Sequence, residues 1–277
     1  MNDQTGTALD SQEVDQLRAE LSALKLELEE TKKSTNQYLQ NVAHQLTAPL
    51  NAIKWNIEAI KDEKIPIPRK KNLLSSIYSQ GTILVHLIKN FSLMSNLEAD
   101  HELGQFRDQP EHVHPLRLAI NLISDFQPQA VELSKKIEIR METFDQVFGA
   151  ESLLVVKNLI AQALSNLLEN AIKYSYTGTT IVVEAVAKEE RETPWRGISV
   201  SNTGLPILRE EIEMLQERGF RGSGAKQKIP AGTGIGLYLA NKVMRLHQGL
   251  VIANAKGPST RMTLLFPPDR IVQEEHS

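Results

Sequence analysis

The sequence predicts two folded regions in chain order: a hairpin of two long α-helices, then an α/β sandwich with helices on one face of a mixed sheet. Apolar residues recur at helical spacing through most of residues 13–100, which predicts the hairpin. From residue 115 on, segments rich in Val and Ile alternate with amphipathic helical segments, which predicts the sandwich. The length of 277 residues also suits about two domains.

The composition narrows the class of protein. With 41% hydrophobic and 23% charged residues, the chain has enough apolar side chains for a packed core. A formal net charge of -3 argues against a general nucleic-acid binder, and the absence of cysteine excludes a disulfide scaffold, a thiolate zinc site and a cysteine nucleophile. No apolar run approaches the ~18 residues of a membrane span, and the N-terminus lacks the features of a signal peptide. We therefore expect a soluble, cytoplasmic chain, or a soluble piece of a longer one.

The N-terminal part divides into a polar leader and a heptad segment. We expect residues 1–12 to be disordered. Over residues 13–35, apolar side chains recur at steps of three and four, at Val14, Leu17, Leu21, Leu24 and Leu28. This spacing predicts a short coiled coil, and we favour dimerisation over a single helix that packs on its own domain.

Residues 36–100 are predicted to form the hairpin, with a turn at 62–70 that contains Pro66 and Pro68. The apolar stripe of the first helix is Val42, Leu46, Leu50, Ile53, Ile57 and Ile60, and that of the second is Leu73, Ile77, Leu84, Ile88, Phe91 and Met94. Two helices cannot bury both stripes alone. Pairing with a second copy into a four-helix bundle is therefore expected.

A linker is expected over residues 101–114, the sandwich over 115–268 and a tail over 269–277. The predicted helices of the sandwich span 116–133, 155–174, 209–217 and 235–247. The predicted strands span 136–142, 179–187, 197–202, 250–254 and 260–266.

His44 lies on the first predicted helix, opposite the apolar stripe, so its imidazole is expected to face solvent. An exposed imidazole can act as a nucleophile near neutral pH, although an isolated surface histidine more often has no function. Pro49 follows five residues later and is expected to bend the helix.

The run NVAHQLTAPLNAI at residues 41–53 resembles the phospho-acceptor box of sensor histidine kinases. The resemblance implies that His44 is phosphorylated and that the hairpin is a dimerisation and histidine-phosphotransfer domain. It also implies a catalytic position for Gln45, where relatives have an acid that takes the imidazole proton. An amide can orient the ring but cannot act as a base. Ala48 replaces the Thr or Asn that supports dephosphorylation of the response regulator in many relatives.

Two further segments suggest an anion and metal site. Asn166 and Asn170 share one face of a predicted helix, carboxamide oxygens suit Mg2+, and Lys173 adds a positive charge nearby. The glycines of GTGIG at residues 232–236 would let the backbone approach an anion at a helix N-terminus. Taken alone, the first could be a surface helix and the second an ordinary loop. No strand directly precedes the glycines, which argues against a dinucleotide-binding βαβ unit.

Four segments in order resemble the N, G1, F and G2 boxes of the ATPase family that contains histidine kinases, Hsp90, MutL and gyrase B. They are NLLENAIKYS at 166–175, SNTGLPI at 201–207, GFRG at 219–222 and GTGIG at 232–236. The resemblance implies that ATP and Mg2+ bind, with Asn170 on Mg2+, Asn166 supporting it, Lys173 on phosphate and Tyr174 against adenine. The other implied nucleotide-binding residues are Asn202, Gly204, Ile207, Arg221, Gly232, Thr233, Gly234, Gly236 and Leu237.

Residues 205–231 would form a lid over the nucleotide. The G1 box departs from its usual pattern, because Asn202 stands where an aspartate normally accepts a hydrogen bond from adenine. Pro206 replaces the second glycine of that box. A variant site with weaker ATP affinity is therefore expected.

Together the boxes imply a homodimeric histidine kinase that phosphorylates His44 with ATP and passes the phosphoryl group to an aspartate of a response-regulator receiver domain. An upstream sensor domain or sensor protein would supply the input, with no nucleic-acid partner. Two alternatives remain. One is a pseudokinase scaffold that dimerises and binds a regulator or nucleotide without autokinase activity; the other is a conformational ATPase, against which the histidine box argues.

Overall fold

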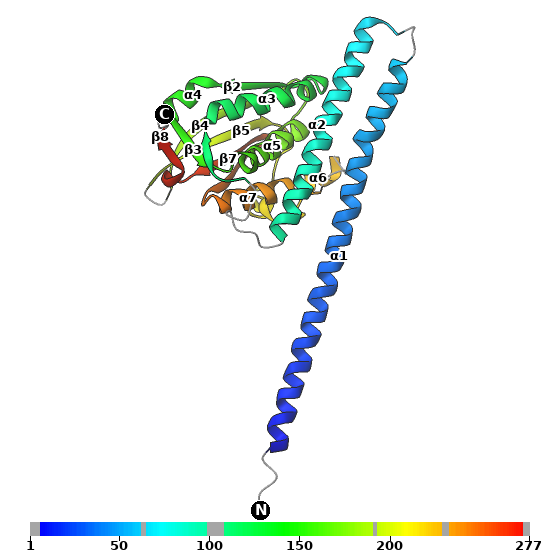
Figure 1. Cartoon of the computed structure of the whole chain (residues 1–277), viewed down its shortest axis with the longest axis vertical. Coiled ribbons are helices and arrows are strands. Elements are labelled where there is room, and N and C mark those ends of the chain that lie inside the picture. The colour runs from blue at the N-terminus through cyan, green and yellow to red at the C-terminus, as the bar shows by residue number, and fades with distance from the viewer. Residues whose placement is uncertain (1–5, 62–64, 99–107, 191–192, 229–232, 274–277) are drawn as a thin grey trace, which may run out of the picture. The chain divides into compact units, whose positions relative to one another are not determined.

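The computed structural model describes residues 6–61, 65–98, 108–190, 193–228 and 233–273 (Figure 1). The chain divides into two compact units, residues 1–44 and 45–277, and each is described by itself. Among the described residues, no helix combines the length and apolarity needed to cross a membrane.

The first unit consists of the N-terminal part of α1, a helix that spans Gly6–Ile60. The heptad side chains of this unit are exposed: Val14, Leu17, Leu21, Leu24 and Leu28. The prediction of disorder over residues 1–12 was wrong for residues 6–12, which are helical, while residues 1–5 lie outside the described ones. Once a helix is nucleated, each added residue gains a backbone hydrogen bond, so a heptad helix extends readily.

The second unit begins with the rest of α1 and with α2, which spans Ile67–Glu98. Asn56 of α1 donates a hydrogen bond to Ser76 of α2 at 3.1 Å, so these two helices form the predicted hairpin. Pro68 falls in the first turn of α2, where a missing N–H is tolerated. α1 continues as a helix through Pro49, and the bend expected there stays a prediction.

A five-stranded mixed sheet forms the centre of the remaining domain, in the order β2-β4-β5-β7-β6. β2 runs parallel to β4 and the other pairs are antiparallel. The strands are β2 (Lys136–Arg140), β4 (Thr180–Glu190), β5 (Thr193–Thr203), β6 (Leu250–Lys256) and β7 (Ser259–Phe266).

Three helices cover one face of this sheet: α3 (Pro115–Glu132), α5 (Lys157–Tyr174) and α7 (Gly236–Leu246) (Figure 1). The core between helices and sheet is mainly aliphatic, and its fully buried side chains include Leu164, Leu168, Ile198, Leu239 and Leu264. This confirms the predicted α/β sandwich with helices on one face.

A second, three-stranded antiparallel sheet was not predicted. Its order is β1 (Glu111–Val113), β3 (Glu151–Val155) and β8 (Ile271–Gln273). β1 lies in the predicted linker and β8 in the predicted tail, so the domain boundaries at residues 115 and 268 are too narrow. Strands of three residues are too short to show an alternating pattern, and they form here because β3 pairs with both.

The remaining elements are short. α4 (Met141–Val147) follows β2 directly, and the predicted helix at 209–217 is two 3-10 turns, Arg209–Glu211 and Glu213–Gln216. α6 (Ser223–Lys228) lies within the predicted lid, and a last 3-10 turn spans Pro268–Arg270.

Candidate functional site

One pocket collects most of the residues that the sequence singled out. Its lining comes from α5, from β5 and β7, from the segment 205–225 and from the turn into α7. The expected residues that line it are Gln45, Asn166, Asn170, Lys173, Tyr174, Asn202, Ile207, Arg221, Thr233, Gly234, Gly236 and Leu237. Gly232 lies outside the described residues.

The sheet register forms one wall of the pocket. Asn202 of β5 is paired directly with Thr260 of β7, and Val200 is paired with Met262. Because alternate residues of a strand point to the same face, both pairs present their side chains on the side covered by α5. All four residues line the pocket, so this wall combines an apolar surface with two polar groups.

α5 presents Asn166 to the pocket in a specific orientation. The side chain is 2% exposed, and its Oδ1 accepts a hydrogen bond from Asn90 of α2 at 2.8 Å. Its Nδ2 is buried and has no hydrogen-bond partner among the described residues. A Cβ placed on Gly236 would lie 3.4 Å from Asn166 Oδ1, so the start of α7 packs directly on this amide.

Two glycines of the boxes are required by close backbone approach. A Cβ on Gly204 would lie 2.0 Å from the carbonyl oxygen of Tyr174, where Leu205 N also donates to that oxygen at 2.9 Å. Gly234 has a φ of 68°, and a Cβ there would lie 2.6 Å from the carbonyl oxygen of Phe220. Gly204 does not line the pocket, so the structure assigns it a packing role at the end of α5.

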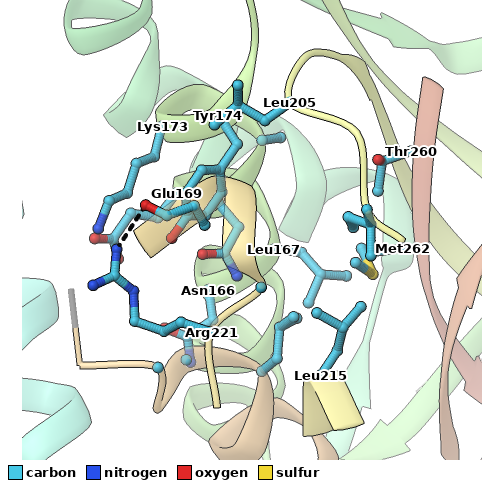
Figure 2. Close-up of a pocket in the computed structure, with 18 of the residues that line it drawn as sticks. Asn166, Leu167, Glu169, Lys173, Tyr174, Leu205, Leu215, Arg221, Thr260 and Met262 are labelled. Atoms are coloured by element: carbon cyan, nitrogen blue, oxygen red, sulfur yellow. Dashed lines mark hydrogen bonds between the residues drawn. The ribbon is translucent and has the colours of Figure 1, made fainter. Parts of the chain in front are cut away.

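Charged side chains gather at one side of the pocket. Figure 2 shows Glu169, Lys173 and Arg221 there, with Leu167, Leu215 and Met262 on the other side. Burial lowers the pKa of Lys173, and the charge of Arg221 acts in the same direction while Glu169 opposes it. Burial raises the pKa of Glu169, against the effect of Lys173. Basic groups on one side and aliphatic groups on the other suit a ligand with an anionic end and a planar apolar end.

Tyr174 connects α5 to the predicted lid. Burial raises its pKa, although a side-chain hydrogen bond from Arg221 and the charge of that guanidinium favour the ionised form. The Lys173 Nζ lies 5.6 Å from the centroid of the Tyr174 ring. Arg221 also donates to the carbonyl oxygen of Ala225 at 3.1 Å, so it ties α5 to the chain around α6.

Glu211 holds the described part of the lid in place, and the sequence did not point to it. Its carboxylate accepts hydrogen bonds from Ser223 N at 2.7 Å and from Leu208 N at 3.4 Å. The bonds from Ser223 are the largest cause of a lowered pKa at Glu211, against the opposing effect of burial. The signal available in sequence was only an acidic residue in a polar segment, which is common on any surface.

Two residues of the hairpin helix α2 also line the pocket, Leu87 and Asn90. Asn90 accepts a hydrogen bond from Gln162 of α5 at 2.8 Å while it donates to Asn166. No sequence pattern pointed to these two residues, because they lie in the predicted helical hairpin, far in sequence from the boxes.

His44 is the last residue of the first unit, and its side chain is exposed, as expected from its place opposite the apolar stripe. Gln45 begins the second unit and lines the pocket. Among the described residues, no group of three His, Asp or Glu side chains could hold a metal ion. The metal prediction therefore depends on the amides of Asn166 and Asn170.

Family models match both regions of the chain. The His Kinase A (phospho-acceptor) domain matches residues 34–100, and the histidine kinase-, DNA gyrase B- and HSP90-like ATPase matches residues 155–270. The chain belongs to the sensor histidine kinases. Most of the pocket lining accordingly belongs to an ATPase domain of that family, and His44 lies within the phospho-acceptor domain.

Curated relatives share low identity over most of this histidine kinase chain. A non-motile and phage-resistance protein of Caulobacter vibrioides is 26% identical over 88% of this chain and 28% of its own length. The sensor histidine kinase RppB of Synechocystis sp. is 26% identical over 83% of this chain and 48% of its own length. The sensor histidine kinase WalK of Bacillus subtilis is 25% identical over 87% of this chain and 38% of its own length. The chain thus spans about half, or less, of the length of these relatives.

One solved structure supports the fold. It is titled full-length ShkA in complex with AMPPNP, and it matches with a TM-score of 0.52 and 16% identity over 86% of this chain and 46% of that chain. At this identity the likeness concerns the fold alone.

Proposed function

We propose that this chain is the catalytic core of a histidine kinase that transfers the γ-phosphoryl group of ATP to His44 and then to an aspartate of a response regulator. The observation that carries the proposal is the pocket itself, in which the N, G1, F and G2 boxes converge. The exposed His44 in a matched phospho-acceptor domain supplies the nucleophile.

The residues of the pocket suit ATP with Mg2+. The buried and unpaired Nδ2 of Asn166 is a donor without an acceptor, which a phosphate oxygen would satisfy. Asn170 offers a carboxamide oxygen of the kind that Mg2+ prefers. When bound, Mg2+ would neutralise charge on the phosphates.

Different side chains of the pocket would bind the phosphates and the adenine. Lys173 and Arg221 would meet the phosphates, and the backbone of residues 233–236 would approach them at the start of α7. The apolar wall of Val200, Leu215 and Met262 would take the adenine, with Asn202 accepting a hydrogen bond from its amino group. Phosphoryl transfer needs mainly positioning and charge stabilisation, which these groups would provide.

In the transfer step, a neutral imidazole nitrogen of His44 attacks the γ-phosphorus. A new P–N bond forms, and the bond between the γ-phosphorus and the bridging oxygen of ADP breaks. Gln45 can hold the imidazole by a hydrogen bond but cannot remove its proton, so we propose that the proton leaves to solvent. The phosphohistidine then donates its phosphoryl group to the receiver aspartate, and the protein acts as a homodimer paired through α1 and α2.

The decisive experiment incubates the purified chain with ATP that carries a labelled γ-phosphate, in the presence of Mg2+. The expected result is a label that is acid-labile and base-stable, that is lost in His44→Ala and that moves to a receiver domain when one is added. His112→Ala is the matched control, because His112 is also exposed but lies outside the box. Bound ATP without label would support a pseudokinase scaffold, and steady hydrolysis that survives His44→Ala would support a conformational ATPase.

A further inference from the structure

The apolar wall of the pocket carries two polar side chains, Asn202 and Thr260. They are paired across β5 and β7, two residues along from the pair of Val200 and Met262. Figure 2 shows Thr260 and Met262 on the side of the pocket away from Lys173. The polar groups that a ring system on this wall would meet are therefore an amide and a hydroxyl.

Both polar side chains are fixed in place, but neither has a fixed role in a hydrogen bond. Asn202 is 9% exposed and Thr260 is 5% exposed, so the packing around them holds both in the wall. Neither side chain makes a hydrogen bond to another described residue. A carboxamide has an acceptor oxygen and a donor nitrogen, which a half turn about its last torsion exchanges, and a hydroxyl both donates and accepts.

The two carboxylates that line the pocket do not supply an acceptor on this wall. Glu169 lies beside Lys173, on the opposite side of the pocket (Figure 2). The carboxylate of Glu211 already accepts hydrogen bonds from the backbone N–H groups of Ser223 and Leu208. Among the described lining residues, the wall therefore has no side chain that can only accept.

This matters because the two kinds of purine have opposite polarity at position 6. Adenine carries an amino group there, which donates, whereas hypoxanthine and guanine carry an oxygen, which accepts. An aspartate in place of Asn202 would accept from the amino group and repel the oxygen. Asn202 itself can accept from the amino group through Oδ1 or, after a half turn of its amide, donate to the oxygen through Nδ2.

We propose that Asn202 relaxes the choice of base, so that the pocket takes 6-oxopurine nucleotides as phosphoryl donors alongside adenine nucleotides. The inference rests on the proposed function, because it takes the apolar wall as the place where the base binds. A site with a polar group of fixed role rejects the wrong base by leaving buried groups unpaired. Asn202 avoids this cost with either base, so the two kinds of nucleotide bind with similar affinity.

The test is isothermal titration calorimetry of the whole, unmutated chain with ADP and with IDP in the presence of Mg2+. IDP is the probe because its base, hypoxanthine, differs from adenine only along the edge formed by N1 and position 6. The Kd for IDP is expected to lie within about tenfold of the Kd for ADP, since each base makes a neutral hydrogen bond with Asn202. A larger preference for ADP would overturn the inference.

A variant then tests whether Asn202 is the residue responsible. Asn202→Asp is expected to raise the ratio of the IDP Kd to the ADP Kd by at least about tenfold, because a carboxylate favours the amino group and repels the oxygen. Asn254→Asp is the matched control, since it makes the same change at an exposed position of β6 outside the pocket and should leave the ratio unchanged. A smaller rise in Asn202→Asp, or an equal rise in the control, would contradict the role of Asn202.

The outcomes also separate this inference from the proposed function. A chain that binds neither diphosphate refutes the nucleotide site, and the inference with it. A chain that binds ADP and labels His44 from ATP, but prefers ADP over IDP by more than the stated ratio, refutes the relaxed choice of base alone. ITP with a labelled γ-phosphate is expected to label His44 in the unmutated chain and not in His44→Ala, and no label from ITP would refute its use as a donor.

Discussion

The helical region and the ATPase domain differ in how far their apolar side chains are exposed to solvent. Among the described side chains of α1 and α2, the buried hydrophobic ones include Leu93 and Met94, while Leu17, Leu50 and Leu74 are each more than half exposed. In the ATPase domain, the helices and the sheet bury an aliphatic core that includes Leu164 and Ile198 at 0% exposure. One region therefore completes its core within the chain, and the other presents its stripe for a partner.

Because of this difference, the folding stability of the chain and the pairing of its helices are expected to depend on different regions. Apolar burial is the main favourable term in folding, so the ATPase domain has the means to fold by itself. The exposed apolar side chains of the helices contribute their burial only when a partner covers them, and we propose that this partner is a second copy of the chain. Mutations of equal size in the two regions should consequently affect different measurements.

The largest expected effect is the truncation of a core leucine. Leu164→Ala should lower the free energy of unfolding of the ATPase domain by about 2–5 kcal/mol, because it leaves a cavity in a close-packed core. The two tryptophans, Trp55 in α1 and Trp195 in β5, allow a clean readout. In a Trp55→Phe background, urea unfolding followed by fluorescence reports on Trp195 alone.

Leu74→Ala in the same background is the matched control. Leu74 is 57% exposed, so the free energy of unfolding measured at Trp195 should change by less than about 0.5 kcal/mol. An equal loss in both variants would show that the exposed apolar side chains of α2 are part of the same cooperative core.

The next effect concerns assembly. Ile88→Asp places a carboxylate in the exposed apolar face of α2, where Ile88 is 57% exposed, and should convert the dimer to a monomer. Analytical ultracentrifugation measures this directly. Asn72→Asp, at an exposed polar position of α2, should leave the dimer intact. Dimerisation that survives Ile88→Asp would place the interface elsewhere.

The smallest expected effect concerns His247, a buried histidine of the ATPase domain. His247 Nε2 accepts a hydrogen bond from Val156 N at 3.0 Å, and Nδ1 lies 2.8 Å from the carbonyl oxygen of Val243. One acceptor and one donor nitrogen describe a neutral ring. Burial lowers the pKa of His247 from 6.5, with a smaller contribution from Arg270, and the bond to Val243 opposes this.

Because the folded form disfavours the proton, the unfolded chain binds more protons below pH 6.5. The stability of the ATPase domain should therefore be full above that pH and fall on acidification toward pH 5, as measured by urea unfolding at each pH. His247→Gln should reduce this slope, whereas His112→Gln, at an exposed site, should leave it unchanged. An equal slope in His247→Gln would refute the assignment.

Much of the fold followed from local patterns. The 3.6-residue period predicted the helical stretches now seen as α2, α3 and α5, and Val- and Ile-rich runs predicted β4 and β7. The misses include β1, β3, β8, α4 and α6, elements of three to seven residues. They are too short for a period to appear, and the strands among them form because they pair with neighbours in space.

The sequence by itself determined the chemistry of this protein: the histidine box, the order of four nucleotide boxes and the heptads are all local runs of residues. Only the tertiary structure decided how that chemistry is assembled. Asn90 meets Asn166 across 76 residues of sequence, and Asn202 meets Thr260 through the register of β5 and β7. Such contacts depend on how helices and strands pack, so no local sequence pattern could predict them.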